Sequence, residues 1–410
     1  MIVMTLVDRP QLLDRFRPYY EDGLIKVVTG LRRSGKSSLM HLLAKDIENR
    51  LDRPSEDFLF LNFEDFGLRN LTHPEALHDF LLDRISKARK RLTVFLDEIQ
   101  NVESWETVVN SIRFRDCCDI YVTGSNSQLL SGELATHLAG RAIQVEVYPF
   151  SYAEFRVARK RLFEDNITDA QIWQEYLTWG GMPGIVRYPD LSVAATYLRD
   201  VYRSILLKDI TDRHNIRQTA LLEMTYAYLL EQVGHRISPD SIEKFLKSER
   251  LRLSRDTLLD YLRAGREAFM HLRVDGVDCI GKNILRLRPK IYCADHGFRE
   301  AFFSGSNNRN IEQVLENIVA TELTRRGWSL RFGSVSDKKV DFVADKNGRR
   351  MYVQVCYLLA SDQTLEREFS PLQAIRDNWP KLILSLDEVN RSTLGIEHRN
   401  LQQWLLQPDV

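Results

Sequence analysis

The first 150 residues alternate between short apolar runs and stretches with helical periodicity. The apolar runs predict strands at residues 25–29, 58–63, 93–96, 120–123 and 143–147. Helical spacing predicts helices between these strands at residues 36–49, 74–90 and 105–113. Because the strands are almost continuously apolar, we expect a parallel sheet covered by helices on both faces, which is an α/β fold.

The rest of the chain is predicted to be mixed, with a larger share of helix. Helices are expected at residues 172–177 and 194–213, on either side of a glycine-rich break at residues 180–184. A helical module ending in two short strands is expected at residues 219–290, and a helix at residues 311–325 precedes strands at 329–332, 340–344 and 352–355. Small and polar residues gather at 304–308, which predicts a linker.

Charge and composition limit the classes of function. The chain has 410 residues, with 57 Lys and Arg against 57 Asp and Glu, so any contact with nucleic acid or membrane requires a local patch. The length predicts about two to four domains. The five cysteines form no Cys-x-x-Cys pair, and the chain has neither a signal-peptide pattern nor a long apolar run. We therefore expect a cytoplasmic protein that does not span a membrane.

A phosphate-binding motif follows the first predicted strand. Residues 30–37 match the pattern G-x-x-x-x-G-K-[ST], and a helix pattern follows them. In this motif backbone N–H groups surround phosphate, Lys36 reaches the β- and γ-phosphates, and the Ser37 hydroxyl binds Mg²⁺. The residues expected to contact ATP are Gly30, Leu31, Arg32, Arg33, Ser34, Gly35, Lys36, Ser37 and Ser38. For Arg32 and Arg33, solvent exposure is the alternative to phosphate contact.

Two carboxylates end the strand predicted at residues 93–96. Asp97 is expected to hold Mg²⁺, and Glu98 to orient and deprotonate the attacking water, as in a Walker B strand. The alternative is a buried strand that simply reaches the surface at charged residues. Glu64 and Asp65 follow another apolar strand, but they come too soon after the motif helix, and we assign them a structural role.

Polar residues after the next strands complete the predicted catalytic set. Ser125 and Asn126 follow the strand at 120–123, where a side chain can bind the γ-phosphate or the attacking water. The alternative is an ordinary Gly-Ser-Asn turn. Arg141 precedes the fifth strand, and it is either an arginine finger, acting on its own or a neighbouring subunit's nucleotide, or merely exposed.

Several segments together resemble a known family. Residues 29–38, 93–100, 123–127 and 138–155, and further segments at 179–183 and 207–210, resemble AAA-type ATPases of bacteria and archaea that carry a C-terminal domain of unknown function. The resemblance covers essentially the whole chain and implies ATP hydrolysis. It also implies an additional-strand P-loop core at 1–150, a helical lid at 151–215, a winged-helix module at 216–303 and a domain similar to restriction endonucleases at 304–410.

The residues of the implied winged-helix module suggest a surface for DNA. Ser238 followed by a proline predicts a helix start, and a second helix through Arg263 would be the recognition helix. Arg255, Arg263 and Arg266, with Arg286 in the wing, are the candidate phosphate contacts. Winged helices also bind proteins, so a protein partner remains the alternative.

The implied nuclease-like domain lacks the residues that cleavage requires. Asp341, supported by Glu316, fits the first metal-binding acid of such a site. Where Glu-x-Lys is required, however, the chain has Gln354 and Cys356, which supply neither the negative charge nor the ammonium. We therefore expect this domain to be catalytically inactive.

These observations predict Mg²⁺-dependent ATP hydrolysis that drives or gates domain movement, with DNA as the expected partner. The first alternative is an ATP-gated signalling switch that acts through protein contacts. A nuclease regulated by ATP is the less favoured alternative. A homo-oligomer is compatible with the sequence, and an Arg141 that acts between subunits would require one.

Overall fold

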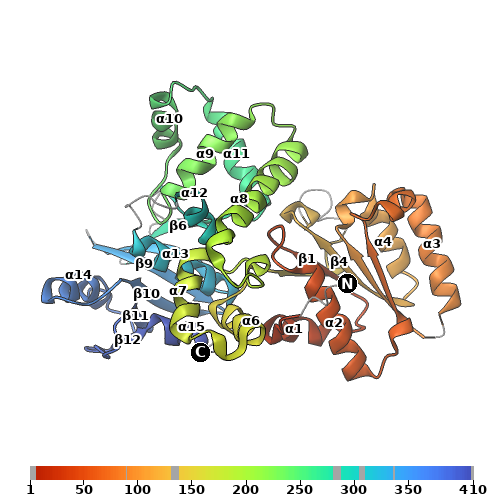
Figure 1. Cartoon of the computed structure of the whole chain (residues 1–410), viewed down its shortest axis with the longest axis horizontal. Coiled ribbons are helices and arrows are strands. Elements are labelled where there is room, and N and C mark those ends of the chain that lie inside the picture. Colours follow the sequence, from red (N-terminus) through yellow and green to blue (C-terminus); the bar gives the residue numbers. More distant parts are fainter. Residues whose placement is uncertain are drawn as a thin grey trace. The chain divides into compact units, whose positions relative to one another are not determined.

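A computed structural model describes residues 6–88, 90–130, 138–279, 288–303, 310–335 and 338–407. The chain forms two compact units (Figure 1). The first unit comprises Met1–Pro149 and Glu267–Phe269, and the second comprises Phe150–Arg266 and Met270–Val410. The predicted linker at residues 304–308 and the wing residues up to 287, among them Arg286, lie outside the described residues.

The first unit is built around one parallel sheet. Its described strands are β1 (Ile25–Thr29), β2 (Phe58–Asn62), β3 (Leu92–Asp97), β4 (Cys118–Gly124) and β5 (Ala142–Glu146). They lie in the order β2-β3-β4-β1-β5, and every neighbouring pair is parallel. The predicted strands and the α/β class are thus confirmed. β4 lies between β1 and β3, and it is the additional strand of this type of P-loop core.

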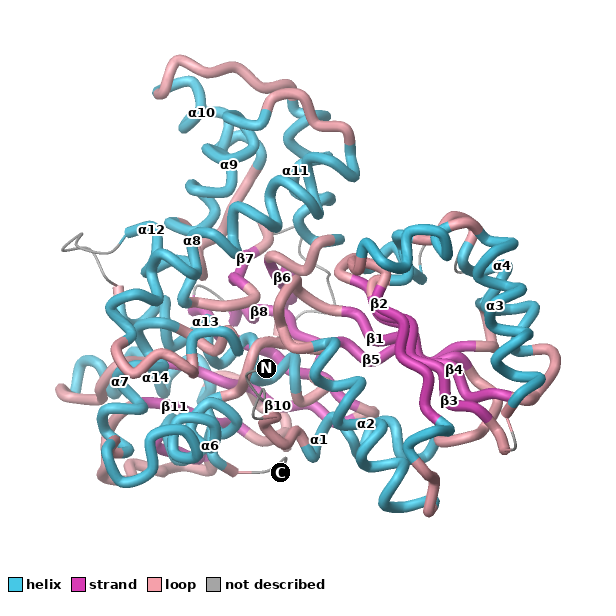
Figure 2. Tube along the Cα trace, turned by 45° about the vertical axis from the view of Figure 1, so that its right-hand side comes forward, coloured by secondary structure: helices cyan, strands magenta, loops and turns pink. Residues whose placement is uncertain are grey.

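Helices cover both faces of this sheet, as the apolar strands predicted. They are α1 (Pro10–Phe16), α2 (Lys36–Leu51), α3 (Pro74–Lys87) and α4 (Trp105–Arg113). Val27 packs in the core cluster that contains side chains of α3 and α4, and Val28 packs in the cluster that contains those of α1 and α2. Figure 2 shows these two pairs of helices on opposite sides of the sheet. Because successive residues of a strand face opposite sides, the two clusters bury the two faces of the sheet.

The second unit contains a mixed sheet. Its described strands are β6 (His271–Asp278), β7 (Lys290–Cys293), β8 (Ser329–Val335), β9 (Lys338–Lys346), β10 (Arg349–Val355), β11 (Lys381–Ser385) and β12 (Ile396–Asn400). They lie in the order β12-β11-β10-β9-β8-β6-β7. β6 pairs in parallel with β8, so strands from the implied winged-helix and nuclease-like segments share one sheet. The division of the chain into four domains remains a prediction.

The second unit also contains many helices, and only some of those described pack against its sheet (Figure 1). The described helices are α6 (Tyr152–Phe163), α7 (Asp169–Trp179), α8 (Ala194–Ser204), α9 (Thr219–Glu231), α10 (Pro239–Ser248), α11 (Arg255–Glu267), α12 (Gly297–Phe303), α13 (Ile311–Arg325), α14 (Asp362–Gln373) and α15 (Leu401–Leu406). The long helix predicted at 194–213 is α8 followed by a π-helical segment, Ile205–Asp212. The predicted start at Ser238 is confirmed, because its hydroxyl accepts a hydrogen bond from the N–H of Ser241 and Pro239 occupies the first turn.

Within the described residues, no helix combines the length and apolarity that crossing a bilayer requires.

Candidate nucleotide-binding site

The predicted phosphate-binding loop joins β1 to α2 and has a backbone that its glycines make possible. Gly30 has φ 141° and Gly35 has φ 100°, both in the region that favours glycine. A Cβ atom on Gly30 would lie only 2.2 Å from the carbonyl oxygen of Val147. Gly35 is the N-cap of α2, so the loop ends at a helix N-terminus whose first N–H groups point towards a bound anion.

Hydrogen bonds inside the loop and from Arg9 hold the loop backbone in place. The N–H of Ser34 donates to the carbonyl of Leu31 at 3.1 Å, which closes a turn. The buried Arg9 guanidinium donates to the carbonyls of Ser34 at 3.3 Å and Tyr148 at 2.9 Å. Arg9 therefore ties the loop to the segment after β5. Sequence reasoning missed this residue, because it lies 25 positions before Ser34 and belongs to no motif.

Lys36 and Glu98, two predicted catalytic residues, come together at this loop. The Lys36 ammonium is buried and donates to the carbonyls of Gly30 at 3.1 Å and Leu31 at 3.2 Å. It also lies 3.9 Å from a carboxylate oxygen of Glu98. The site thus has a cation held over the loop and an anion facing it. The sequence predicted Lys36 and Glu98 as separate catalytic residues, and the structure places their charged groups near each other.

The end of β3 is joined to β4 by a shared hydroxyl group. Thr123 donates a hydrogen bond to a carboxylate oxygen of Asp97, and its hydroxyl accepts one from the N–H of Glu98 at 2.9 Å. Glu98 has a left-handed backbone with φ 53°, and the Gln100 amide donates to its carboxylate. Sequence reasoning missed Thr123 and Gln100. The only sequence feature that could have indicated Thr123 is that it is a hydroxyl residue at the end of an apolar strand.

The remaining predicted residues lie around the same edge of the sheet. Ser125 and Asn126 are buried just after β4, and β4 pairs with β1 so that Gly124 lies opposite Thr29, immediately before the loop. Arg32 forms an ion pair with Glu64 at 2.7 Å, which gives both residues a structural partner. Arg33 and Ser37 are exposed, and Ser38 is half-buried.

The residues present fit a magnesium-bound nucleotide. The first turn of a helix of 16 residues offers N–H donors to phosphate, and Lys36 adds a positive charge. The Ser37 hydroxyl and the Asp97 carboxylate are the oxygen ligands that Mg²⁺ prefers. Ser34 fits as well, because its buried hydroxyl has no hydrogen-bond partner among the described residues.

The chain is similar to one described domain family, to uncharacterized proteins and to a solved ATPase. Residues 22–156 match the family model described as an AAA domain, and residues 170–309 match a domain of unknown function. An uncharacterized protein of Haemophilus influenzae is 33% identical over 98% of this chain and 99% of its own length. The chain belongs to the AAA-type P-loop ATPase family. An uncharacterized protein of Methanocaldococcus jannaschii is 30% identical over 89% of this chain and 80% of its own length. A solved Walker-type ATPase of Pyrococcus abyssi is 17% identical, with a TM-score of 0.49, over 72% of this chain and 95% of that one.

In this AAA-type chain, Arg141 does not lie at the loop. Its carbonyl accepts a hydrogen bond from the N–H of Ile25 at 2.9 Å, which places it beside the start of β1. The loop begins at the other end of β1. Because a strand rises about 3.3 Å per residue, that end is about 16 Å away. The Arg141 guanidinium instead lies 5.6 Å from the ring of Phe114. Action on the nucleotide of its own chain is therefore not supported, and a role between subunits remains a prediction.

The arginines predicted to contact DNA lie on α11, apart from Arg286. Arg255 pairs with Asp240 at 3.5 Å, and Arg263 pairs with Asp260 at 2.7 Å. Arg266 is exposed. The sequence of α11 contains three arginines but also two aspartates and one glutamate, so the helix is not a uniformly basic element.

The structure brings together the predicted remnant of a nuclease site and adds a cation to it. The ammonium of Lys290 donates to Glu316 at 2.6 Å and lies 3.7 Å from Asp341. Lys290 is buried at the start of β7. An ammonium therefore lies beside both carboxylates that a metal ion would bind.

The altered residues are also engaged in this cluster. The Gln354 amide donates to Glu368 at 2.8 Å, and its oxygen accepts from the N–H of Asp341 at 3.2 Å. Burial raises the pKa of the Cys356 thiol, so this side chain is neutral. Among the described residues, no group of three or more His, Cys, Asp or Glu is arranged to hold a metal ion.

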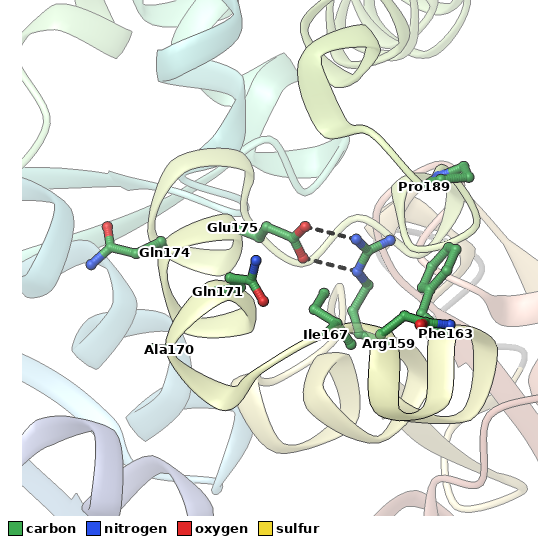
Figure 3. Close-up of a pocket in the computed structure, with 9 residues that line it drawn as sticks. Arg159, Phe163, Ile167, Ala170, Gln171, Gln174, Glu175 and Pro189 are labelled. Atoms are coloured by element: carbon green, nitrogen blue, oxygen red, sulfur yellow. Dashed lines mark hydrogen bonds and ion pairs between the residues drawn. The ribbon is translucent and has the colours of Figure 1, made fainter.

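A pocket of about 600 Å³ lies in the implied lid, lined mainly by α6 and α7 (Figure 3). Arg159 and Glu175 face each other across it in a two-point ion pair, with N–O distances of 2.9 and 2.7 Å. Arg159 also donates to the carbonyls of Val186 at 2.9 Å and Tyr188 at 2.6 Å. Because each nitrogen of its guanidinium is engaged within the unit, Arg159 joins these segments and does not serve as an anion receptor.

Proposed function

We propose that the first unit binds Mg-ATP at residues 30–38 and hydrolyses it. The observation that carries this proposal is the approach of the Lys36 ammonium to the Glu98 carboxylate at 3.9 Å, at the edge where the loop begins. A buried lysine at this loop by itself indicates only phosphate binding. The Glu98 carboxylate, which follows β3 and faces the lysine, adds a group that can activate water for hydrolysis.

Each residue has a defined part in this proposal. Lys36 exchanges its hydrogen bonds to the loop carbonyls for hydrogen bonds to phosphate oxygens. Ser37 and Asp97 hold Mg²⁺, which neutralises charge on the phosphates. Glu98 accepts the proton of the attacking water, and Asn126 orients that water or the γ-phosphate. Thr123 is a positioning residue, because it fixes Asp97 and the backbone of Glu98 at once.

Matched variants test the proposal. We expect Lys36→Ala to lose ATP binding and turnover, whereas Lys45→Ala, an exposed lysine on the same helix, should retain both. Glu98→Gln should still bind ATP and should lose turnover, while Glu103→Gln, at a nearby exposed acid, should turn over normally. Measurable turnover in Glu98→Gln equal to that of the unchanged chain would refute the assignment of the base.

We further propose that ATP turnover drives or gates movement of the second unit on DNA, with Arg255, Arg263, Arg266 and Arg286 as phosphate contacts. The exposure of the three described arginines supports this proposal. Arg255 and Arg263 would have to give up their ion pairs with aspartate to contact DNA phosphates. The affinity for DNA should therefore fall steeply as the salt concentration rises. Turnover should rise when duplex, single-stranded or branched DNA is added at low salt.

One observation favours the alternative of an ATP-gated switch that acts on a protein partner. The equal numbers of acidic and basic residues on α11 suit a protein contact better than a DNA backbone. Turnover that stays slow and unchanged with every nucleic acid, at low and high salt, would support the switch and refute the DNA proposal.

For the remnant site, we propose that the cluster of Lys290, Glu316 and Asp341 is structural and performs no cleavage. The support is the ammonium that lies beside both carboxylates. DNA incubated with Mg²⁺ or Mn²⁺ should remain intact. Cleavage that Asp341→Ala abolishes would overturn this proposal.

In a homo-oligomer, Arg141 could reach a nucleotide that its own chain does not bind. We propose that Arg141 acts on the nucleotide of a neighbouring subunit when subunits share nucleotide sites. Mixing Arg141→Ala chains with Glu98→Gln chains should then restore turnover at interfaces that combine one intact Arg141 with one intact Glu98. Absence of any recovery in mixtures that associate would refute the role.

A further inference from the structure

A basic, tryptophan-rich cavity lies at one edge of the sheet in the second unit. Its volume is about 860 Å³, and it is lined at the starts of β10 and β11, by β12, and by residues of α13 and α15. β10, β11 and β12 are parallel, so their amino ends meet at this edge. Gln354 and Val355, beside the remnant nuclease site, end β10 on the opposite edge, about 20 Å away along the strand. The cavity is therefore distinct from that site.

Positive charge dominates the wall of this cavity. Six of the lining side chains are cationic and one is acidic. Acidic partners compensate four of the cations, in the pairs Arg326–Glu322, Arg350–Asp345, Lys381–Asp377 and Arg399–Glu397. The Arg349 side chain, by contrast, is exposed and forms no ion pair or hydrogen bond with any described residue. The cavity thus offers an uncompensated guanidinium to an anion.

Aromatic rings form the other part of the wall. Three of the six tryptophans of the chain, Trp328, Trp379 and Trp404, line the cavity. Trp404 is buried, and the Arg326 guanidinium lies 4.3 Å from its ring, so this pair is fixed in place. Trp379 is 40% exposed and makes no ring contact with any described residue. A free aromatic face and a free guanidinium therefore line the same cavity.

We propose that this cavity binds a nucleotide unit, with the base stacked on Trp379 and the phosphate paired with Arg349. Nucleobases stack on exposed aromatic side chains, and a guanidinium matches the geometry of phosphate. The volume falls within the range of about 300–1,000 Å³ for small-molecule sites. An acidic peptide would pair with Arg349 but would leave the aromatic wall without a partner. A free nucleotide and a nucleotide of a single strand share this chemistry.

The test uses the full chain with Lys36→Ala, so that the loop of the first unit does not contribute. The probes are a short fluorescein-labelled single-stranded oligonucleotide, followed by anisotropy, and AMP as competitor. Trp379→Ala and Arg349→Ala should each weaken binding about tenfold. Trp379→Phe and Arg349→Lys should retain part of the affinity. Arg376→Ala, at an exposed arginine that does not line the cavity, should bind like its parent.

The outcomes separate the two sources of the ligand. Displacement of the oligonucleotide by AMP supports a free nucleotide, and binding that AMP does not displace supports a single strand. The proposal is overturned if neither probe binds, if Trp379→Ala or Arg349→Ala binds like Arg376→Ala, or if polyglutamate displaces the probe as well as nucleotides do. In the chain with Lys36 intact, the cavity variants should retain ATP turnover, so failure here leaves the proposed hydrolysis at the loop untouched.

Discussion

Replacing Thr123 with valine should damage both the stability of the first unit and its proposed hydrolysis. Valine has nearly the same shape but lacks the hydroxyl that accepts from the N–H of Glu98 and donates to Asp97. An orphaned buried N–H costs about 1–3 kcal/mol, and a lost hydrogen bond to a charged group costs about 1.5–3 kcal/mol. Because these terms are not additive, we expect Thr123→Val to lower the free energy of unfolding by about 2–4 kcal/mol.

Two control variants make this expectation specific. Thr123→Ser keeps the hydroxyl and should retain most of the stability. Thr93→Val removes a buried hydroxyl from the neighbouring strand β3, where it has no hydrogen-bond partner among the described residues. That substitution should therefore be neutral or stabilising. The contrast isolates the hydrogen bonds of Thr123 from the general effect of placing valine in a strand.

The assays are thermal denaturation and steady-state ATP turnover. For a unit of this size, we expect Thr123→Val to lower Tm by roughly 5–15 °C. Displacement of the Glu98 carboxylate should lower kcat on the order of 10- to 100-fold, with a smaller change in KM. If Thr123→Val matches Thr93→Val in both Tm and kcat, the idea that Thr123 positions Asp97 and Glu98 is wrong.

Three further predictions test other parts of the chain. Gly30→Ala should destabilise the first unit by more than about 3 kcal/mol and prevent nucleotide binding, because its Cβ would meet a carbonyl oxygen at 2.2 Å. Gly140→Ala, which has φ 69° but open space around it, should cost only about 1 kcal/mol in a chemical denaturation series, and equal losses would contradict the steric argument. Burial raises the pKa of Asp295 to about 6, so this carboxyl loses its proton at a higher pH in the folded state than in the unfolded chain. Its contribution to stability should fall by about 2 kcal/mol as pH rises from 4 to 7, and Asp295→Asn should flatten that part of the stability profile. Lys290→Ala should cost about 3–5 kcal/mol, because it leaves two carboxylates uncompensated, and Mg²⁺ or Mn²⁺ should restore part of the lost Tm. Lys339→Ala, exposed beside the same cluster, should change Tm little, and a loss as large as that of Lys290→Ala would refute the buried-pair argument.

The first unit could be predicted well because its site is built from short sequence segments. β1, the loop and the start of α2 are contiguous, so residues 30–37 carry both the motif and its structural setting. The apolar runs located the described strands of this sheet, and the three central strands β1, β3 and β4 are buried on both faces, which leaves an unbroken apolar pattern. Arg9 and Thr123 were missed for the opposite reason. Their roles depend on hydrogen bonds to residues 25 or more positions away, and no local pattern records such contacts.

The second unit shows where reasoning from local patterns fails. Lys290 is buried where β7 joins the sheet, beside Glu316 of α13, and the alternating arginines and leucines before it do not predict this contact. The burial of this lysine depends on two acids that are 26 and 51 positions further along the chain. Arg349 and Trp379 are likewise 30 positions apart, and they line one cavity because β10 and β11 start at the same edge. To predict a site that separate strands form at the edge of a sheet, one must know the order of those strands. The strand order of this sheet follows from tertiary packing, which local sequence patterns do not record.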